Sequence, residues 1–131
     1  MSNHESESTF YDHIGGHDTF QRLVEAFYEG VKSDPVLRPM YPEEDMDGAI
    51  WRLRSFLEQY WGGPKTYSEQ RGHPRLRMRH QPFKVNPEAR DRWLQHMSAA
   101  LDRLELSELD RAMFWDYLER AAHSMVNTFE D

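Results

Sequence analysis

A histidine near the middle of the chain stands where it could hold a metal-containing cofactor. His80 closes the arginine-rich segment Arg77-Met78-Arg79-His80 and is followed by Gln81-Pro82-Phe83. A neutral imidazole is a common axial ligand of haem iron, and arginine pairs well with carboxylates. The segment therefore predicts a porphyrin bound through a single histidine. Taken alone, this segment leaves open the alternative that His80 is an ordinary surface histidine.

The residues before His80 suit this task. Pro74 can open a short helix that runs to His80, which puts Leu76 one turn before the histidine on the same face. Leu76 could pack against the ring, and its carbonyl could hold the second imidazole nitrogen and so orient the ligand. Arg75, Arg77 and Arg79 place positive charge where the acid groups of a porphyrin would emerge.

The other metal-binding side chains form no competing site. There is no cysteine, and the remaining histidines show neither His-Glu-x-x-His nor Glu-x-x-His spacing. His13 and His17 are four residues apart, but Gly15-Gly16 interrupts any helix that would align them. The pattern indicates one histidine ligand, with a prosthetic group supplying the rest.

Three aromatic residues could serve a ligand on the other side of such a ring. Tyr28, Tyr41 and Trp93 each carry a hydrogen-bond donor at the tip of an apolar ring, on or beside the buried face of the expected segment. They could donate to one small, partly negative ligand such as dioxygen. Their spacing in the sequence does not show that the three side chains converge. The alternative is that each donates a hydrogen bond to a different backbone carbonyl.

Composition narrows the function classes. The chain has 131 residues and a formal net charge of -7, which disfavours nucleic acid or an anionic membrane as the main partner. Its polar first residues resemble no secretion signal, and no apolar run is long enough to span a bilayer. We expect a cytoplasmic protein with an acidic, disordered tail over 1–8 and a single domain over 9–131.

Apolar residues recur at helical spacing throughout, and no segment alternates as a strand would, so we expect an all-α fold. Short helices are expected over Thr9 to His13 and Pro74 to His80, and the segment 65–74 is expected to be irregular. The long helices are expected to start near Asp18, at Asp45 or Asp47, at Asn86-Pro87-Glu88 and at Ser107, and the first two to end at Ser33-Asp34-Pro35 and Gly62-Gly63-Pro64.

Taken together, these residues resemble the group II truncated haemoglobins, in particular their oxygen-avid actinobacterial branch. The resemblance covers about residues 9 to 128. Its motifs are Gly15-Gly16, Tyr28, Tyr41-Pro42-Glu43, the run from Leu57 to Pro64, Tyr67-Ser68, the run from His73 to His80, and Trp93.

The resemblance implies a two-over-two helical sandwich around haem b, with His80 as the proximal iron ligand. Tyr28, Tyr41 and Trp93 would line the distal side, where Ala49 would leave a small opening and Leu53 would meet the ring. The implied haem contacts are Arg79 as the best propionate partner, then Arg52, Tyr67, Leu76, Phe83 and Met97.

Such a pocket predicts tight binding of dioxygen and of other small ligands such as NO, CO or sulfide, with slow release. Redox turnover of NO or peroxide would need an electron-donating reductase, and assembly into a homo-oligomer stays open. The alternative from another class is a haem-free helical interaction module whose aromatic residues form a core and a partner groove.

Overall fold

The computed structural model describes residues 9–40, 46–72 and 85–126. Every regular element within these ranges is helical, which confirms the all-α prediction. No helix in them is long and apolar enough to cross a membrane. The elements in chain order are α1 (Phe10–His13), α2 (Gly16–Lys32), the 3-10 helix η2 (Arg38–Met40), α3 (Met46–Tyr60), α4 (Thr66–Arg71), α6 (Pro87–Asp102) and α7 (Glu108–Met125).

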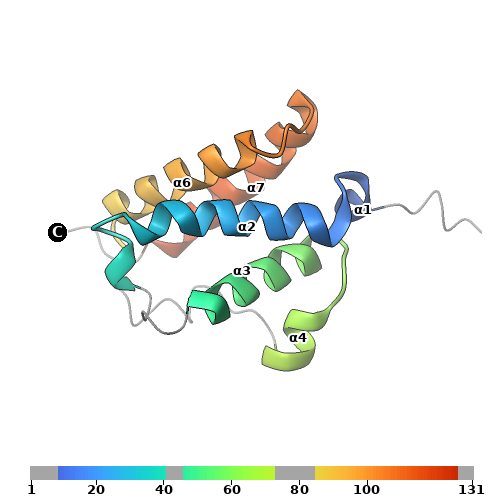
Figure 1. Ribbon diagram of the computed structural model, residues 1–131, viewed down its shortest axis with the longest axis horizontal. Helices are drawn as coiled ribbons and strands as arrows, with labels where there is room; N and C mark the ends of the chain where they lie inside the picture. Colours follow the sequence, from blue (N-terminus) through green and yellow to red (C-terminus); the bar gives the residue numbers. More distant parts are fainter. Residues whose placement is uncertain (1–8, 41–45, 73–84, 127–131) are drawn as a thin grey trace, which may run out of the picture.

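Two pairs of long helices form the body of the protein. Helix α2 packs against α3 on one side and against α6 on the other, and α6 in turn packs against α7. Figure 1 shows α2 crossing the centre, with α6 and α7 above it and α3 below it. This is the expected two-over-two arrangement, and the short helix α4 extends it beside α3.

Helix α2 supplies much of the core because its apolar residues recur every three or four positions. Phe20, Leu23, Val24, Phe27 and Val31 have no exposed surface. This spacing places all five along one stripe of the helix, and the stripe is covered by both neighbouring helices. The predicted helix is confirmed, although it begins at Gly16 rather than near Asp18.

Side-chain caps start three of the helices where the sequence predicts them. The side chains of Thr9, Asn86 and Ser107 accept hydrogen bonds from the backbone N–H groups of Asp12, Ala89 and Asp110. Pro87 stands at the first position of α6, where its missing N–H costs nothing.

Helix α3 was expected to start at Asp45 or Asp47, and Asp47 is not its capping residue. This helix begins at Met46, so Asp47 lies in its first turn rather than at the cap. The other candidate, Asp45, lies outside the described residues, as does the short helix expected over Pro74 to His80.

The segment 65–74 is not irregular throughout, because it contains α4. The Gln59 side chain holds this short helix: its oxygen accepts from the Ser68 N–H at 3.0 Å, and its nitrogen donates to the Ser68 hydroxyl at 2.7 Å. Tyr67 is buried between Trp51 and Phe56. These contacts are tertiary, so local propensity did not predict the helix.

Gly15 and Gly16 allow the sharp turn between α1 and α2. Their φ angles are +117° and +68°, in the region that L residues rarely adopt. The Thr19 hydroxyl lies over Gly15 and donates to the Ile14 carbonyl at 2.7 Å, so a Cβ at Gly15 would collide with it. A Cβ at Gly16 would meet only the Tyr11 ring, at an ordinary 3.7 Å.

Gly15→Ala should therefore destabilise the protein more than Gly16→Ala. Both changes force alanine into a left-handed conformation, at a cost of about 1–2 kcal/mol, and only Gly15→Ala adds the collision with Thr19. Urea unfolding followed by circular dichroism measures the two losses. Equal losses would contradict the role assigned to the Thr19 contact.

Candidate functional site

A cavity of about 430 Å³ lies between the two helix pairs. This volume falls in the range of about 300–1,000 Å³ that is typical of small-molecule and cofactor sites. Its described walls come from α2, η2, α3, α4, α6 and α7 and are mostly apolar. The described residues that line it are Tyr28, Leu37, Met40, Ala49, Arg52, Leu53, Phe56, Leu57, Tyr67, Arg71, Val85, Ala89, Arg90, Trp93, Tyr117, Leu118, Ala121, Ala122 and Met125.

Two of the three predicted ligand donors line this one cavity. Tyr28 comes from α2 and Trp93 from α6, and Phe27 lies between them. The Phe27 ring meets Tyr28 edge-on at 4.9 Å between centroids and Trp93 at 5.3 Å. Phe27 has no exposed surface, so its packing fixes the two rings relative to each other. The third predicted donor, Tyr41, lies outside the described residues.

The wall opposite these rings is formed by α3. Ala49 and Leu53, one turn apart, both line the cavity. Ala49 is buried, and its methyl group leaves more room than any larger side chain would. Phe56 and Leu57 continue the same wall one turn further along α3.

The charged residues on the described part of the cavity wall are all basic. Among the described residues that line it, Arg52, Arg71 and Arg90 are basic and none is acidic. The sequence predicted Arg52 and Tyr67 at the cofactor, and both line the cavity. Arg71 and Arg90 were missed, because no local spacing in the sequence connects either residue to the cavity.

An apolar cavity edged by arginines matches a flat hydrophobic ring that bears carboxylates. The apolar walls would take the ring, and the guanidinium groups would pair with its acids. Haem has both properties, so the described residues fit this group.

Several predicted site residues are placed elsewhere or fall outside the described residues. Met97 has no exposed surface and packs in the core, and it is not among the residues that line the cavity. The predicted proximal side lies outside the described residues; it consists of His80, Leu76, Arg79 and Phe83.

The residues of α7 that line the cavity were not predicted as site residues, although their helical spacing is visible in the sequence. Leu118, Ala122 and Met125 recur at helical spacing and line the cavity, as does Tyr117. The spacing predicts a buried face but does not say whether that face meets another helix or a cavity.

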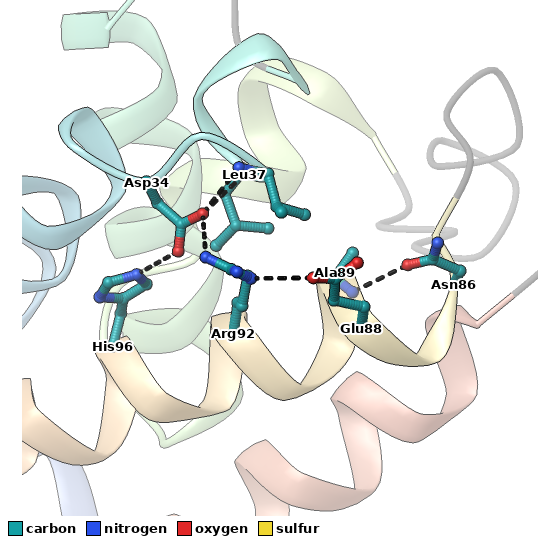
Figure 2. A network of polar contacts seen from close by, with 8 residues as sticks. Asp34, Leu37, Asn86, Glu88, Ala89, Arg92 and His96 are labelled. Carbon is teal, nitrogen blue, oxygen red and sulfur yellow. Dashed lines mark hydrogen bonds and ion pairs between the residues drawn. The ribbon is translucent and has the colours of Figure 1, made fainter. Parts of the chain in front are cut away.

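A buried carboxylate ties α6, which carries Trp93, to the end of α2. Asp34 follows α2, and its side chain accepts four hydrogen bonds (Figure 2). The backbone N–H groups of Val36 and Leu37 donate to one oxygen at 2.8 and 3.2 Å. From α6, Arg92 donates to that oxygen at 3.1 Å, and His96 bonds the other oxygen at 2.7 Å.

The electrostatics of Asp34 follow from these donors. Burial alone would raise its pKa, because a carboxylate loses water there. The hydrogen bond from His96, those from the two backbone N–H groups and the charge of Arg92 outweigh burial and lower the pKa to about 2. The carboxylate is therefore ionised at neutral pH and holds α6 beside α2 next to the cavity.

Comparison with known proteins places the chain in a family. Residues 9–127 match the family model "Bacterial-like globin". The "Group 2 truncated hemoglobin YjbI" of Bacillus subtilis is 41% identical over 115 residues, which make up 88% of this chain and 86% of that protein.

Solved structures agree with this match. A thermostable haemoglobin from the actinobacterium Thermobifida fusca is 61% identical, with a TM-score of 0.90 over 93% of this chain and 99% of that one. A truncated oxygen-avid haemoglobin from Bacillus subtilis is 40% identical, with a TM-score of 0.85 over 91% of this chain and 99% of that one.

The fold and the cavity are those of a globin. Within that class the chain belongs to the group II truncated haemoglobins, and the resemblance seen in its motifs is confirmed. Membership of this family implies a haem cofactor and the binding of diatomic ligands such as dioxygen.

Loss of the Asp34 charge should lower the stability of the folded protein. It should also make that stability less sensitive to acid pH. A carboxyl group with a pKa of about 2 in the folded protein, below its ordinary 3.8, adds stability that is complete above about pH 4. That stability is lost as the pH falls from about 4 towards 2. Asp34→Asn should cost about 1.5–3 kcal/mol at neutral pH, because bonds to a charged acceptor are lost.

Acid titration and urea unfolding, followed by circular dichroism, measure both effects. Asp116→Asn is the matched control, because Asp116 forms an exposed ion pair with Arg120 on α7. Wild-type acid sensitivity in Asp34→Asn, or an equal loss in Asp116→Asn, would contradict the role given to Asp34.

Proposed function

We propose that this protein binds haem b in the cavity, with His80 as its axial ligand, and holds dioxygen tightly beside Tyr28, Tyr41 and Trp93. The observation that carries the proposal is the placement of Tyr28 and Trp93 on the wall of one apolar cavity, in a protein of the globin family. His80 and Tyr41 enter from the sequence motifs.

Bound haem supplies an iron that accepts a diatomic ligand and shifts electron density onto it. The work of the protein is to hold the ring, keep water out and stabilise that charge. The apolar walls do the first two, and the arginines on the cavity wall pair with the propionates. Arg79, Arg52 and Tyr67 were the candidates from the sequence, and Arg71 and Arg90 join them.

The donors decide how long the ligand stays. A hydrogen bond to a charged acceptor contributes roughly 1.5–3 kcal/mol, so two of them strengthen binding on the order of 10²–10⁴-fold. Most of this gain appears as slow release. The oxygen-avid relative from Bacillus subtilis is consistent with such a site.

A protein that releases oxygen slowly serves poorly as a bulk carrier. We propose that it stores or scavenges dioxygen, or turns over NO, peroxide or sulfide with electrons from a reductase. Family membership favours this class over the haem-free interaction module. A cytoplasmic location is part of the proposal.

His80→Ala should abolish or strongly weaken haem binding, because it removes the proposed axial ligand. Haem titration followed by the Soret band measures the affinity. His13→Ala is the control: His13 is exposed, pairs with Asp110 at 2.9 Å and is not among the residues that line the cavity. An unchanged Soret band in His80→Ala would overturn the proposed ligand.

Tyr28→Phe and Trp93→Phe should each speed oxygen dissociation by about 10- to 100-fold, since each removes one bond to a charged acceptor. Tyr41→Phe should act in the same direction. Stopped-flow displacement of oxygen measures the rates. Tyr11→Phe, which changes a ring stacked on Phe20 away from the cavity wall, should leave the rate unchanged. Wild-type rates in all three variants would refute the proposed donors and leave haem binding intact.

A further inference from the structure

The His96 side chain joins α6 to the turn that follows α2 (Figure 2), and it stands three residues beyond Trp93. Its Nε2 atom lies 2.7 Å from the Asp34 carboxylate, the shortest of the four hydrogen bonds that this group accepts. Because Asp34 is ionised and can only accept, Nε2 must carry the hydrogen. The Asp34 side chain is 4% exposed and is held by two backbone N–H groups of its own turn, so it gives α6 a fixed point of attachment.

Gly30, in the last turn of α2, makes room for the His96 ring. A Cβ at Gly30 would come 2.3 Å from His96 Nδ1 and 3.0 Å from the ring carbons Cγ and Cε1. Gly30 is not among the glycines with a positive φ, so the backbone there would accept alanine. A glycine in a helix is less favourable than alanine by up to about 1 kcal/mol. The close approach of the His96 ring is therefore the feature of the structure that requires a residue without a side chain at this position.

The second cation at Asp34 constrains α6 less than His96 does. Arg92 lies 3.1 Å from Asp34, but it also pairs with Glu88 of its own helix at 3.4 Å. The Arg92 side chain is 35% exposed, against 24% for His96, so water screens its charge more. The longer bond of Arg92 is thus shared and partly solvated, whereas the rigid His96 ring is seated between Asp34 and Gly30.

The attachment of His96 controls the direction in which the Trp93 indole points. Residues three apart in a helix lie about 60° apart around its axis, so the two side chains turn together when α6 rotates. At the radius of about 5–6 Å that a helix has with its side chains, a rotation of about 10° moves a side-chain tip by about 1 Å. Such a shift stretches a hydrogen bond of about 2.9 Å beyond its effective range.

We propose that His96 is a positioning residue for Trp93, and that its bond to Asp34 sets how slowly dioxygen leaves the cavity. The inference rests on the proposed function, because it needs haem in the cavity and Trp93 as a donor to the ligand. His96 is not among the described residues that line the cavity, so it acts on the ligand through Trp93. Haem shifts electron density onto dioxygen and far less onto carbon monoxide, so a well-aimed donor slows the release of dioxygen in particular.

Stopped-flow ligand displacement from the haem-loaded protein tests this role. His96→Leu removes the donor and should speed oxygen dissociation by about 3- to 10-fold, because a misaimed bond loses only part of its energy. The dissociation of carbon monoxide should be nearly unchanged. His96→Gln keeps an N–H donor and should restore most of the wild-type oxygen rate. Gly30→Ala should speed oxygen release as His96→Leu does, because its Cβ pushes the ring away from Asp34.

The matched control is Glu29→Gln. Glu29 of α2 pairs with Arg103 at the end of α6 at 3.3 Å, so this contact also joins the two helices. Both of its side chains are exposed, at 65% and 61%, and Arg103 stands ten residues beyond Trp93. Glu29→Gln should leave oxygen dissociation unchanged.

A double-mutant cycle separates positioning of the indole from a general loosening of the fold. In a Trp93→Phe background the aimed donor is already gone, so adding His96→Leu should not speed oxygen release further. A general loosening of the two helices would speed release in both backgrounds, and it would speed the release of carbon monoxide as well.

Any of three results would overturn the positioning role. They are a wild-type oxygen rate in His96→Leu or Gly30→Ala, an equal acceleration by His96→Leu in the Trp93→Phe background, and an equal acceleration of carbon monoxide release. If His96→Leu does not fold, Gly30→Ala and His96→Gln decide alone. The Trp93→Phe rate reports on the proposed function separately. A wild-type rate there refutes the donor and the positioning role together, whereas a faster rate with unaffected His96 and Gly30 variants refutes the positioning role alone.

Discussion

The position of α6 beside α2 is the constraint on which the site depends. The core stripe of α2 brings the two helices together, and hydrophobic packing alone tolerates some sliding. The Asp34 carboxylate adds direction, because its four donors come from the turn after α2 and from α6 (Figure 2). Arg92 and His96 flank Trp93 in the sequence, so the bonds that fix these two side chains also fix the helix that carries the indole.

The remaining elements complete a cavity around that fixed pair. Helix α3 closes the side opposite Trp93 with Ala49 and Leu53, and α7 closes another side with Leu118. Four long helices thus surround a volume too large to be left by ordinary side-chain packing. Its apolar surface and its arginines are what a haem requires, and the family explains why such a volume is retained.

Some features could be predicted from the sequence because their causes are local. The caps at Asn86 and Ser107, and the turn at Gly15-Gly16, depend on residues within three or four positions of one another. The α2 stripe is a periodic pattern and is equally local. The family resemblance implied roles for Tyr28, Ala49, Arg52, Leu53, Tyr67 and Trp93, and all six line the cavity. The roles of His80 and Tyr41 stay predictions, because both lie outside the described residues.

Other features were decided only by the tertiary structure, because their causes lie far apart in the chain. Helix α4 depends on Gln59 and on the ring contacts of Tyr67, and Asp34 meets partners on α6. Arg71 and Arg90 reach the cavity through the packing of their helices. Met97, one turn beyond Trp93 on α6, is buried in the core and is not among the described residues that line the cavity. The sequence by itself determined which segments are helical and which face of each is apolar. Which residues share a cavity was decided by packing, since that depends on how separate helices meet.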